Sequence, residues 1–459
     1  MRLHYGLLTL IFFANGCAML KPGTPPMPEL PETFSAPSLT NSVVVQSAWW
    51  HTFESSELDQ LINQALTNSP SLDQVWARLS QAEATATRLG AARLPSIDLT
   101  GSGSRTEALN AGTDTERYSA GAAASFELDL WGRVNAVQMA AAIDAIGARD
   151  AVETAAMSLS AEVANRWHQL IARKREYEIL QQQLHANQTS LELIELRFRK
   201  SLSTGLAVLQ QRQTVEATAA LLPLAERAEK TAALELARLL GTTEPVALTT
   251  PHLLELSPLP APGIPADLLE QRPDVRRARN ALEAAGWRVA AARAERFPAI
   301  RLTGRIESNE PTAEALFDDW FSTLAGSLTS PLFNAGASRA TIRQNEAVLR
   351  ERFAAYRETL INAVQEVEQA LNLEHTQATY AKAVTVRLDA AQQAYDEAVS
   401  RYRNGAVDYT TVLFQLNTLQ QLERAQISAH ADQIAYRIAL YRALGGNWTA
   451  ELVDSGESP

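Results

Sequence analysis

Residues 337–404 read ASRATIRQNEAVLRERFAAYRETLINAVQEVEQALNLEHTQATYAKAVTVRLDAAQQAYDEAVSRYRN. The stretch contains neither proline nor glycine, and residues that favour helices dominate it. Its apolar residues recur at spacings of three and four, the pattern of a helix that packs lengthwise against other helices. They are Phe353, Leu360, Val364, Val367, Leu371, Val384, Leu388, Ala391, Tyr395 and Tyr402. At about 1.5 Å per residue, such a helix spans about 100 Å, which is typical of a protein that bridges a distance.

The chain carries an internal duplication, and this helix belongs to its second copy. Residues 92–101, ARLPSIDLTG, resemble residues 295–304, ERFPAIRLTG, at an offset of 203. Residues 197–201, RFRKS, resemble residues 401–405, RYRNG, at an offset of 204. Alanine-rich helices resemble one another by chance, but chance does not explain a shared Pro-x-Ile-x-Leu-Thr-Gly pattern. We therefore predict a first repeat at 49–245, a linker at 246–265, a second repeat at 266–446 and a C-terminal tail at 447–459.

Each repeat contains a predicted β-hairpin and a predicted helical hairpin. After a proline in each repeat the apolar period changes to two, which indicates strands. In the second repeat we expect residues 307–319 to form a polar loop, followed by a strand that carries Leu324, Leu328 and Leu332 and is ended by Pro331 and Asn334. The predicted β-hairpins lie at about 96–130 and about 298–332, and the predicted helical hairpins at about 134–240 and about 337–444.

These elements predict a fold class that is mainly α with a small β part, in which four strands have the length of membrane strands. Four strands would leave open edges in lipid, where unpaired backbone groups are not tolerated, and single-chain membrane barrels start at about eight strands. A barrel therefore has to close by oligomerisation. A ring of helical hairpins continuous with that barrel would form a conduit through one membrane and across the space beneath it.

The composition argues against several other classes of protein. The 459 residues carry a net charge of −11 at pH 7, which argues against nucleic acid as a partner. No apolar run reaches the roughly 18 residues of a membrane-spanning helix. The seven histidines are scattered, and there is no His-Glu-x-x-His motif or cysteine pair, so we expect no enzyme activity, metal site or cofactor. Glu127 and Asp129 lie at the end of a strand, and we interpret them as residues of a strand-to-helix junction.

The N-terminus resembles a bacterial lipoprotein signal. Arg2 and the apolar residues 7–13 precede Cys17, the only cysteine of the chain. We expect residues 1–16 to be removed as a signal peptide and Cys17 to be acylated. Each buried CH₂ of an acyl chain contributes about 0.8 kcal/mol, so several chains give a stable membrane anchor. The proline-rich residues 17–48 would then form an extended tether. The alternative is an incidental cysteine in a cleaved leader.

Six motifs, in one order and on this duplication, resemble the outer-membrane factors of tripartite efflux pumps in the TolC superfamily, most closely the OprM/NodT-like lipoprotein branch. They are WW at 49–50, SFELDLWGRV at 125–134, PADLLEQRPD at 265–274, AARAERFP at 291–298, PLFNAG at 331–336 and LYRALGGNW at 440–448. The resemblance implies a homotrimer in the outer membrane of a Gram-negative bacterium. Its three chains would form a 12-stranded β-barrel on a 12-helix periplasmic tunnel. It would be a passive exit duct for drugs or other toxic small molecules, loaded by a periplasmic adaptor and an inner-membrane transporter.

The resemblance also implies that the turns of the two helical hairpins dock the adaptor. The residues at these turns are Lys200, Ser201 and Leu202 in the first repeat, and Asn404, Gly405 and Ala406 in the second. Gly405 stands where a tight turn between helices needs positive φ, whereas the first copy has Ser201 at that position. The alternative is that Gly405 only forms the turn and contacts no partner.

Relatives place acidic side chains just past this turn, where they narrow the closed tip. Here these positions hold Thr411 and Phe414, and the first copy holds Ala207 and Gln210. Our hypothesis is that Phe414 narrows the tip as an apolar constriction, and the alternative is that it packs between helices. Asp408 also lies near the tip, where it either contributes to the constriction or caps the returning helix.

Two other functions remain open at this point. A periplasmic coiled-coil scaffold without a pore would share the helices and the tether, but it would not need alternating hairpins at matching repeat positions. The same fold can also serve the export of protein or polysaccharide. No motif of the chain names the cargo.

Overall fold

The computed structural model describes residues 31–34, 48–107, 114–249, 256, 259–260, 271–446 and 448–449. The predicted signal peptide with Cys17, and most of the tether, the linker and the tail, lie outside the described residues. The chain divides into two compact units, each built from segments of both sequence halves. Among the described residues, the sheet unit comprises 77–107, 114–150 and 274–359, and the helical unit comprises the others.

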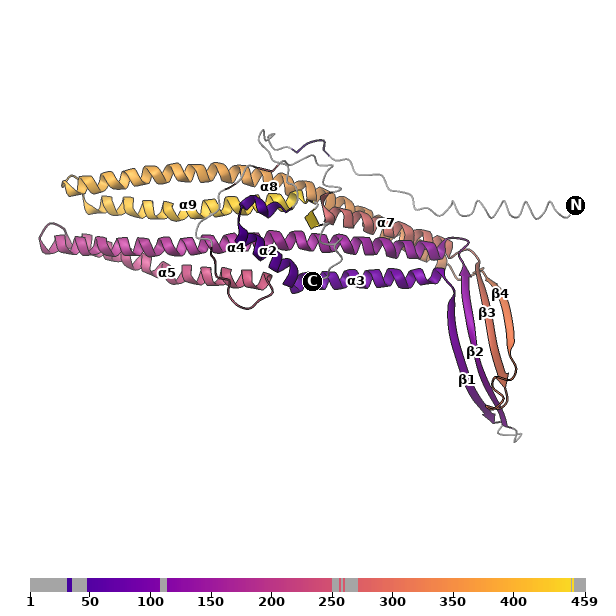
Figure 1. Ribbon diagram of the computed structural model, residues 1–459. Helices are drawn as coiled ribbons and strands as arrows, with labels where there is room; N and C mark the ends of the chain where they lie inside the picture. The colour runs from indigo at the N-terminus through magenta and orange to yellow at the C-terminus, as the bar shows by residue number, and fades with distance from the viewer. Residues whose placement is uncertain are drawn as a thin grey trace. The chain divides into compact units, whose positions relative to one another are not determined.

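The elements follow the predicted order (Figure 1). The helices are η2 (Trp49–Phe53), α2 (Ser56–Asn68), α3 (Pro70–Gly90), η3 (Ala91–Arg93), α4 (Arg133–Arg199), α5 (Gly205–Leu239), α7 (Pro273–Ala294), α8 (Ala337–Arg403) and α9 (Tyr409–Leu444). The strands are β1 (Ser96–Glu107), β2 (Asp114–Leu128), β3 (Ala299–Glu310) and β4 (Phe321–Thr329).

The two longest helices, α4 and α8, have 67 residues each, and both their first and their last residues are 204 positions apart. The helix predicted at 337–404 is confirmed as α8, one residue shorter. Each is followed by a return helix, α5 with 35 residues and α9 with 36. Among the described helices, none combines the length and the apolar character that crossing a membrane requires.

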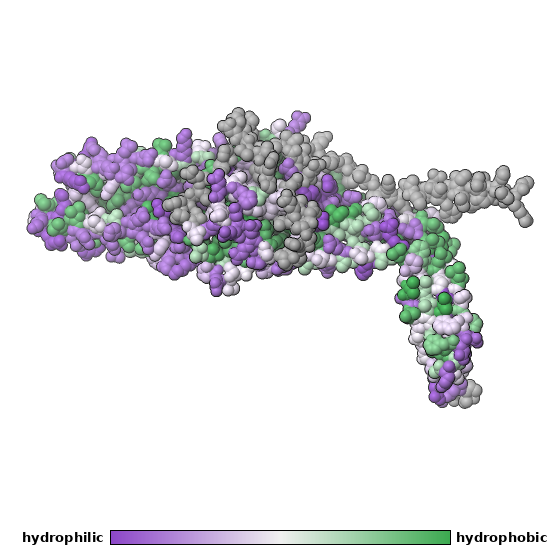
Figure 2. Space-filling model, viewed as in Figure 1, coloured by the Kyte–Doolittle hydropathy of each residue, from purple (hydrophilic) through white to green (hydrophobic). Residues whose placement is uncertain are grey.

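The four strands form one antiparallel sheet in the order β1-β2-β3-β4 (Figure 1). The register places apolar residues of neighbouring strands on one face, since Leu99 pairs with Ala122 and Ala122 pairs with Ile306. Alternate positions such as Arg301 and Arg305 lie on the opposite face. Leu99 on the apolar face is 87% exposed. In Figure 2, hydrophobic and neutral residues cover most of the length of the strands, while hydrophilic residues gather where β1 ends and β2 begins.

Two strand boundaries correct the sequence-based prediction. β3 runs to Glu310, into the predicted polar loop at 307–319, because its last residues continue the ladder and Glu310 pairs with Tyr118. β4 ends at Thr329, so the prediction that Leu332 lies on this strand was wrong. The physical reason is Pro331, which has no N–H group to donate to a strand ladder.

The junction between β2 and α4 is made by the two carboxylates that end the strand. Asp129 accepts hydrogen bonds from the backbone N–H groups of Val134 at 2.9 Å and Asn135 at 2.7 Å, which satisfies two free donors in the first turn of α4. Glu127 forms an ion pair with Arg133 at 2.7 Å. The interpretation of these carboxylates as junction residues is therefore confirmed.

Candidate functional site

The turn between α4 and α5 is closed by two backbone hydrogen bonds. The amide of Leu202 donates to the carbonyl of Arg197 at 2.8 Å, and the amide of Ser201 donates to the carbonyl of Phe198 at 2.9 Å. These two bonds define a Schellman motif, in which one residue takes a left-handed conformation. That residue is Ser201, with a φ of 58°.

The turn between α8 and α9 repeats this geometry 204 residues later. Ala406 donates to the carbonyl of Arg401 at 2.9 Å, and Gly405 donates to the carbonyl of Tyr402 at 3.1 Å. Gly405 has a φ of 72°, so the positive φ predicted for it is confirmed. Ser201 adopts the same left-handed conformation, although a residue with a side chain pays about 1–2 kcal/mol for it. The serine of the first turn, in place of the glycine of the second, therefore does not change the geometry of the turn.

Both return helices begin at the residue that the duplication predicts, but only one has a side-chain cap. Thr204 precedes α5, and its side chain accepts a hydrogen bond from the amide of Ala207 at 3.2 Å. Asp408 holds the same place before α9, and its carboxylate makes no capping hydrogen bond. Asp408 therefore occupies the predicted cap position but leaves its charged group exposed at the turn.

The structure places the predicted docking residues at the surface of the two turns. The exposed residues are Lys200, Ser201 and Leu202 at one turn, and Asn404, Gly405 and Ala406 at the other. Thr411 and Phe414 are exposed on α9, one helical turn apart, while Val412 and Leu413 between them are buried. Phe414 is 67% exposed, so it does not pack between the helices of its own chain.

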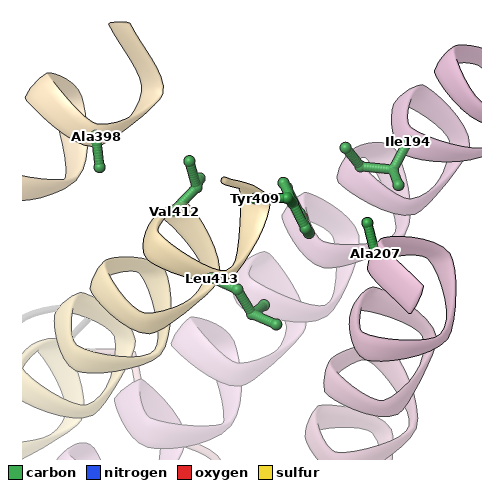
Figure 3. Packing of buried hydrophobic residues seen from close by; sticks show 6 residues of the cluster. All are labelled: Ile194, Ala207, Ala398, Tyr409, Val412 and Leu413. Atoms are coloured by element: carbon green, nitrogen blue, oxygen red, sulfur yellow. The ribbon is translucent and has the colours of Figure 1, made fainter. Parts of the chain in front are cut away.

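A buried apolar cluster holds the two helical hairpins together near these turns (Figure 3). It takes residues from all four long helices of the helical unit. Its members are Ile194, Ala207, Ala398, Tyr409, Val412 and Leu413, with Val208, Tyr395, Val399 and Tyr402 packed against them. Because both hairpins contribute, moving one hairpin away from the other would expose this cluster to water.

Tyr409 also joins the cluster to a network of buried polar side chains. Its hydroxyl donates to Gln211 Oε1 at 2.7 Å, and Gln211 Nε2 donates to the carbonyl of Asn187 at 2.7 Å. Asn187 Nδ2 donates to Thr218 Oγ1 at 2.9 Å, and Gln420 Nε2 donates to Asn187 Oδ1 at 2.9 Å. The network ties α9 to α4 and α5, and breaking it would leave buried polar groups without partners.

Two further tyrosine interactions lie beside this network. The guanidinium of Arg197 lies 4.9 Å from the ring centroid of Tyr402, close enough for a cation–π interaction. The rings of Tyr402 and Tyr409 have centroids 5.4 Å apart. Burial, and then the neighbouring Tyr395 and Tyr402, raise the pKa of Tyr409. Its phenol therefore keeps its proton at physiological pH and remains a hydrogen-bond donor.

In the part of the chain that the structure describes, no group of three or more His, Cys, Asp or Glu side chains is arranged to hold a metal ion. The features near the turns are hydrogen bonds, apolar contacts and exposed charges. Such features serve docking and conformational change.

The family model described as "Outer membrane efflux protein" matches residues 61–242 and 264–446. The chain belongs to this family. A relative of this outer membrane efflux protein is the pyoverdine export outer membrane protein OpmQ of Pseudomonas putida, which is 32% identical over 98% of both chains. Another is the probable efflux pump outer membrane protein TtgC of Pseudomonas putida, 29% identical over 96% of this chain and 95% of that protein. The solved structure of CusC matches with a TM-score of 0.86 and 28% identity, over 93% of this chain and 99% of CusC.

Family membership confirms the predicted fold class and function class. The outer membrane efflux protein is mainly helical, is built on a duplication, and has the fold of the trimeric channels in its family. It is the outer-membrane channel of an efflux system, and its family and relatives are transport channels. The alternative of a scaffold without a pore was therefore wrong.

Proposed function

We propose that three copies of this outer membrane efflux protein form a passive exit duct for small molecules, which an inner-membrane transporter and a periplasmic adaptor deliver. Each chain supplies four strands and two helical hairpins, so three chains give a 12-stranded barrel and a 12-helix tunnel. Transport energy would come from the transporter.

The sheet is the observation that carries this proposal. In the described chain β1 and β4 are the edges of the sheet, and each pairs on one side only. One face of the sheet is apolar and exposed, which fits contact with lipid. Open edges are not tolerated in lipid, so β1 of one chain has to pair with β4 of another.

A small-molecule cargo is supported by the relatives. OpmQ is named for pyoverdine export, and TtgC is named as a component of an efflux pump. Neither name refers to a protein or a polysaccharide, which were the other cargo classes considered from the sequence. We place drugs and other toxic compounds first among the candidate cargoes for this reason.

A lipid on Cys17 would anchor each chain in the outer membrane, so that the helical hairpins extend into the periplasm. The support is the sequence before and after this cysteine, since Cys17 lies outside the described residues. Cys17→Ser is expected to abolish incorporation of radiolabelled palmitate. A variant with a substitution in a barrel strand and an intact Cys17 should still incorporate palmitate. Full labelling of the Cys17→Ser variant would refute the anchor.

The two turns would dock the adaptor, and the residues just past the second turn would narrow the tunnel. Thr411 and Phe414 are exposed in the first two turns of α9, and Asp408 is exposed directly before the helix, which supports a constriction made by this segment. Phe414→Ala is expected to raise resting conductance and vancomycin sensitivity because it removes an exposed ring. If Phe414→Ala showed wild-type conductance and wild-type vancomycin sensitivity, Phe414 would not be part of the constriction.

The deciding experiment is the mass of the complex in mild detergent, together with projection images of the same sample. The expected mass, after subtraction of detergent, is three times the mass of one mature chain. The images should show a three-fold ring. A monomer, or particles without a ring, would refute closure by three chains.

A further inference from the structure

The two β-hairpins pair their strands in the same register. Ser96 pairs with Ser125 in the first hairpin, and Ala299 pairs with Thr329 in the second. The first strands of the hairpins are related by the sequence offset of 203, which carries Ser96 to Ala299. The second strands are related by the offset of 204 that also relates α4 and α8, and it carries Ser125 to Thr329. The two offsets therefore convert a strand pairing of one repeat into that of the other.

The boundary between the hairpins can be carried to the edges of the sheet in the same way. β2 and β3 join the two hairpins within one chain, while β1 and β4 are the edges (Figure 1). In a closed ring of copies, β4 of one chain and β1 of the next stand in the relation of β2 to β3. Leu128 pairs with Ile300 at the inner boundary. The offsets carry this pair to Leu332, just past the end of β4, and Ile97 on β1.

The exposure of these four residues differs between the inner boundary and the edges. Leu128 and Ile300, which pair within the chain, are both half-buried. Leu332 is 96% exposed and Ile97 is 75% exposed. The equivalent apolar contact is therefore made inside the chain and left open at its two edges.

The apolar face of the sheet continues across the boundary in this register. Ala124 pairs with Gly304 at the inner boundary, and the offsets carry this pair to Leu328 on β4 and Gly101 on β1. Residues of the apolar face are odd-numbered in β1, as Leu99 is, and even-numbered in the other three strands. The register pairs odd with even numbers and so keeps both edges on one face. A slip by one residue would place the leucines of β4 against the polar face of β1.

The sizes of the opposed side chains also fit. In the β3–β4 hairpin, Leu302 pairs with Gly326, and its Cδ2 atom lies 3.6 Å from the position of a Cβ on that glycine. The leucine thus covers the glycine opposite. At the edges, Leu328 is exposed, and among the described residues no side chain comes within 4 Å of a Cβ placed on Gly101. The register brings these two residues together, so the same leucine–glycine fit would form between chains.

From the shared offsets, the continuous face and the leucine–glycine fit, we propose that β4 of one chain pairs with β1 of a second copy in the register that places Leu328 opposite Gly101. Leu332 then lies beside Ile97, and the neighbouring chain covers both edges. The inference rests on the proposed function, because it assumes that the sheet edges of three chains close on one another.

The test is disulfide formation in outer-membrane vesicles that contain the full-length protein. Residues directly opposite each other in antiparallel strands have Cβ atoms about 4.5–5.5 Å apart, whereas diagonal neighbours lie about 7–8 Å apart. A disulfide needs Cβ atoms about 3.5–4.5 Å apart and therefore discriminates between registers. We expect Leu328→Cys/Gly101→Cys to give covalent dimers and trimers on oxidation. Leu328→Cys/Leu99→Cys and Leu328→Cys/Gly103→Cys, which represent slips by two residues, should give at least fivefold less.

The matched control is Ala124→Cys/Gly304→Cys, which occupies the same ladder position within one chain. On oxidation it should lose its free thiols and still migrate as a single chain in a denaturing gel. The single variants Leu328→Cys and Gly101→Cys reveal any cross-link that forms through Cys17.

A second pair is tested at the next ladder position, because closer and wider pairs alternate along antiparallel strands. Thr329→Cys/Thr100→Cys is this pair, and its control within one chain is Ser125→Cys/Thr303→Cys. The mass of each variant is measured before oxidation. If one double variant does not assemble, the other decides.

The outcomes separate this inference from the function on which it rests. If the protein is a trimer and the controls oxidise, but a slipped pair cross-links best or neither pair in register cross-links, the register is overturned while closure by three chains stands. If the wild-type protein is a monomer, the proposed function fails and the inference fails with it.

Discussion

The hydrogen bond between Tyr409 and Gln211 is expected to hold α9 against α5 near the turns. Tyr409→Phe removes only the hydroxyl that donates to Gln211 at 2.7 Å and leaves the ring in the apolar cluster. Gln211 has 0% exposed surface, so its side-chain oxygen would lose this partner away from water. A buried acceptor without a partner costs about 1–3 kcal/mol.

This cost applies to the packed arrangement of the helices and not to one in which they have separated and water reaches Gln211. Since about 1.4 kcal/mol corresponds to a factor of ten, the population of the separated arrangement should rise about 5- to 150-fold. The assays are single-channel conductance in planar bilayers and vancomycin sensitivity of a host that lacks its own outer-membrane channel. We expect more frequent open events and higher sensitivity.

Tyr395→Phe is the matched control. Tyr395 packs against the same cluster, and none of the hydrogen bonds found among the described residues involves its hydroxyl. If Tyr409→Phe behaves like Tyr395→Phe and like the wild type in both assays, the hydrogen bond does not restrain the turns and the reasoning is refuted. The mass of each variant has to be that of the wild type, so that dissociation is not mistaken for opening.

Three further predictions concern the turns, the junction and a buried histidine. Gly405→Ala is expected to cost about 1 kcal/mol, because a Cβ there meets no atom within 4 Å and only the φ of 72° opposes it. Ser201→Gly should relieve the equivalent strain in the first turn. Amide hydrogen exchange should therefore speed up at Ala406 in Gly405→Ala and slow down at Leu202 in Ser201→Gly. Unchanged exchange rates in both variants would contradict this prediction. Asp129→Ala should lower the thermal midpoint, at a cost of about 1–2 kcal/mol, because the amides of Val134 and Asn135 lose their acceptor, whereas Asp129→Asn should retain part of this stability. Burial, and then repulsion from His430, lower the pKa of His168 from 6.5 to about 3, so below pH 6.5 the unfolded chain binds a proton that the folded chain does not. The free energy of unfolding should therefore fall as the pH decreases from 6.5 towards 3, by about 2 kcal/mol per chain at pH 5. Melting curves at pH 7.5 and pH 5 should show this loss of stability for the wild type and for the control His185→Gln. His168→Gln should not show it.

The long helices and the repeat were predictable because they depend on local sequence patterns, namely helix propensity, the spacing of apolar residues and repeated motifs. The run without proline or glycine at 337–404 became α8 within one residue at its end, since propensity and apolar period agree there. The sequence already marked Pro331 as an end of this strand, but the leucine pattern led us to keep Leu332 on it, whereas β4 ends two residues before the proline, at Thr329. Where the spacing of apolar residues and the backbone hydrogen bonding disagreed, the hydrogen bonding decided where the strand ends.

The buried polar network was not predictable from one sequence. Asn187, Gln211 and Gln420 lie on three different helices, and their partners are fixed only when those helices pack together. A polar residue at a core position of each helix was the only available signal. The exposure of Leu202 and Leu206 near the α4–α5 turn was not predictable for the opposite reason, since leucines at helical spacing predict a core, and only the packed structure shows that these two remain exposed.

The shared backbone of the two turns has a consequence for symmetry. A trimer would display six turns of nearly identical shape, so its tip would have a pseudo-six-fold arrangement of backbone. The side chains reduce this arrangement to three-fold, because Leu202 and Leu206 are exposed at one turn where Ala406 and Thr410 are exposed at the other. A partner that recognises only the backbone shape of a turn would have six binding sites on the assembly. A partner that recognises the side chains of one turn would have three. The stoichiometry of the complex would thus be set by the divergence of the two copies after the duplication.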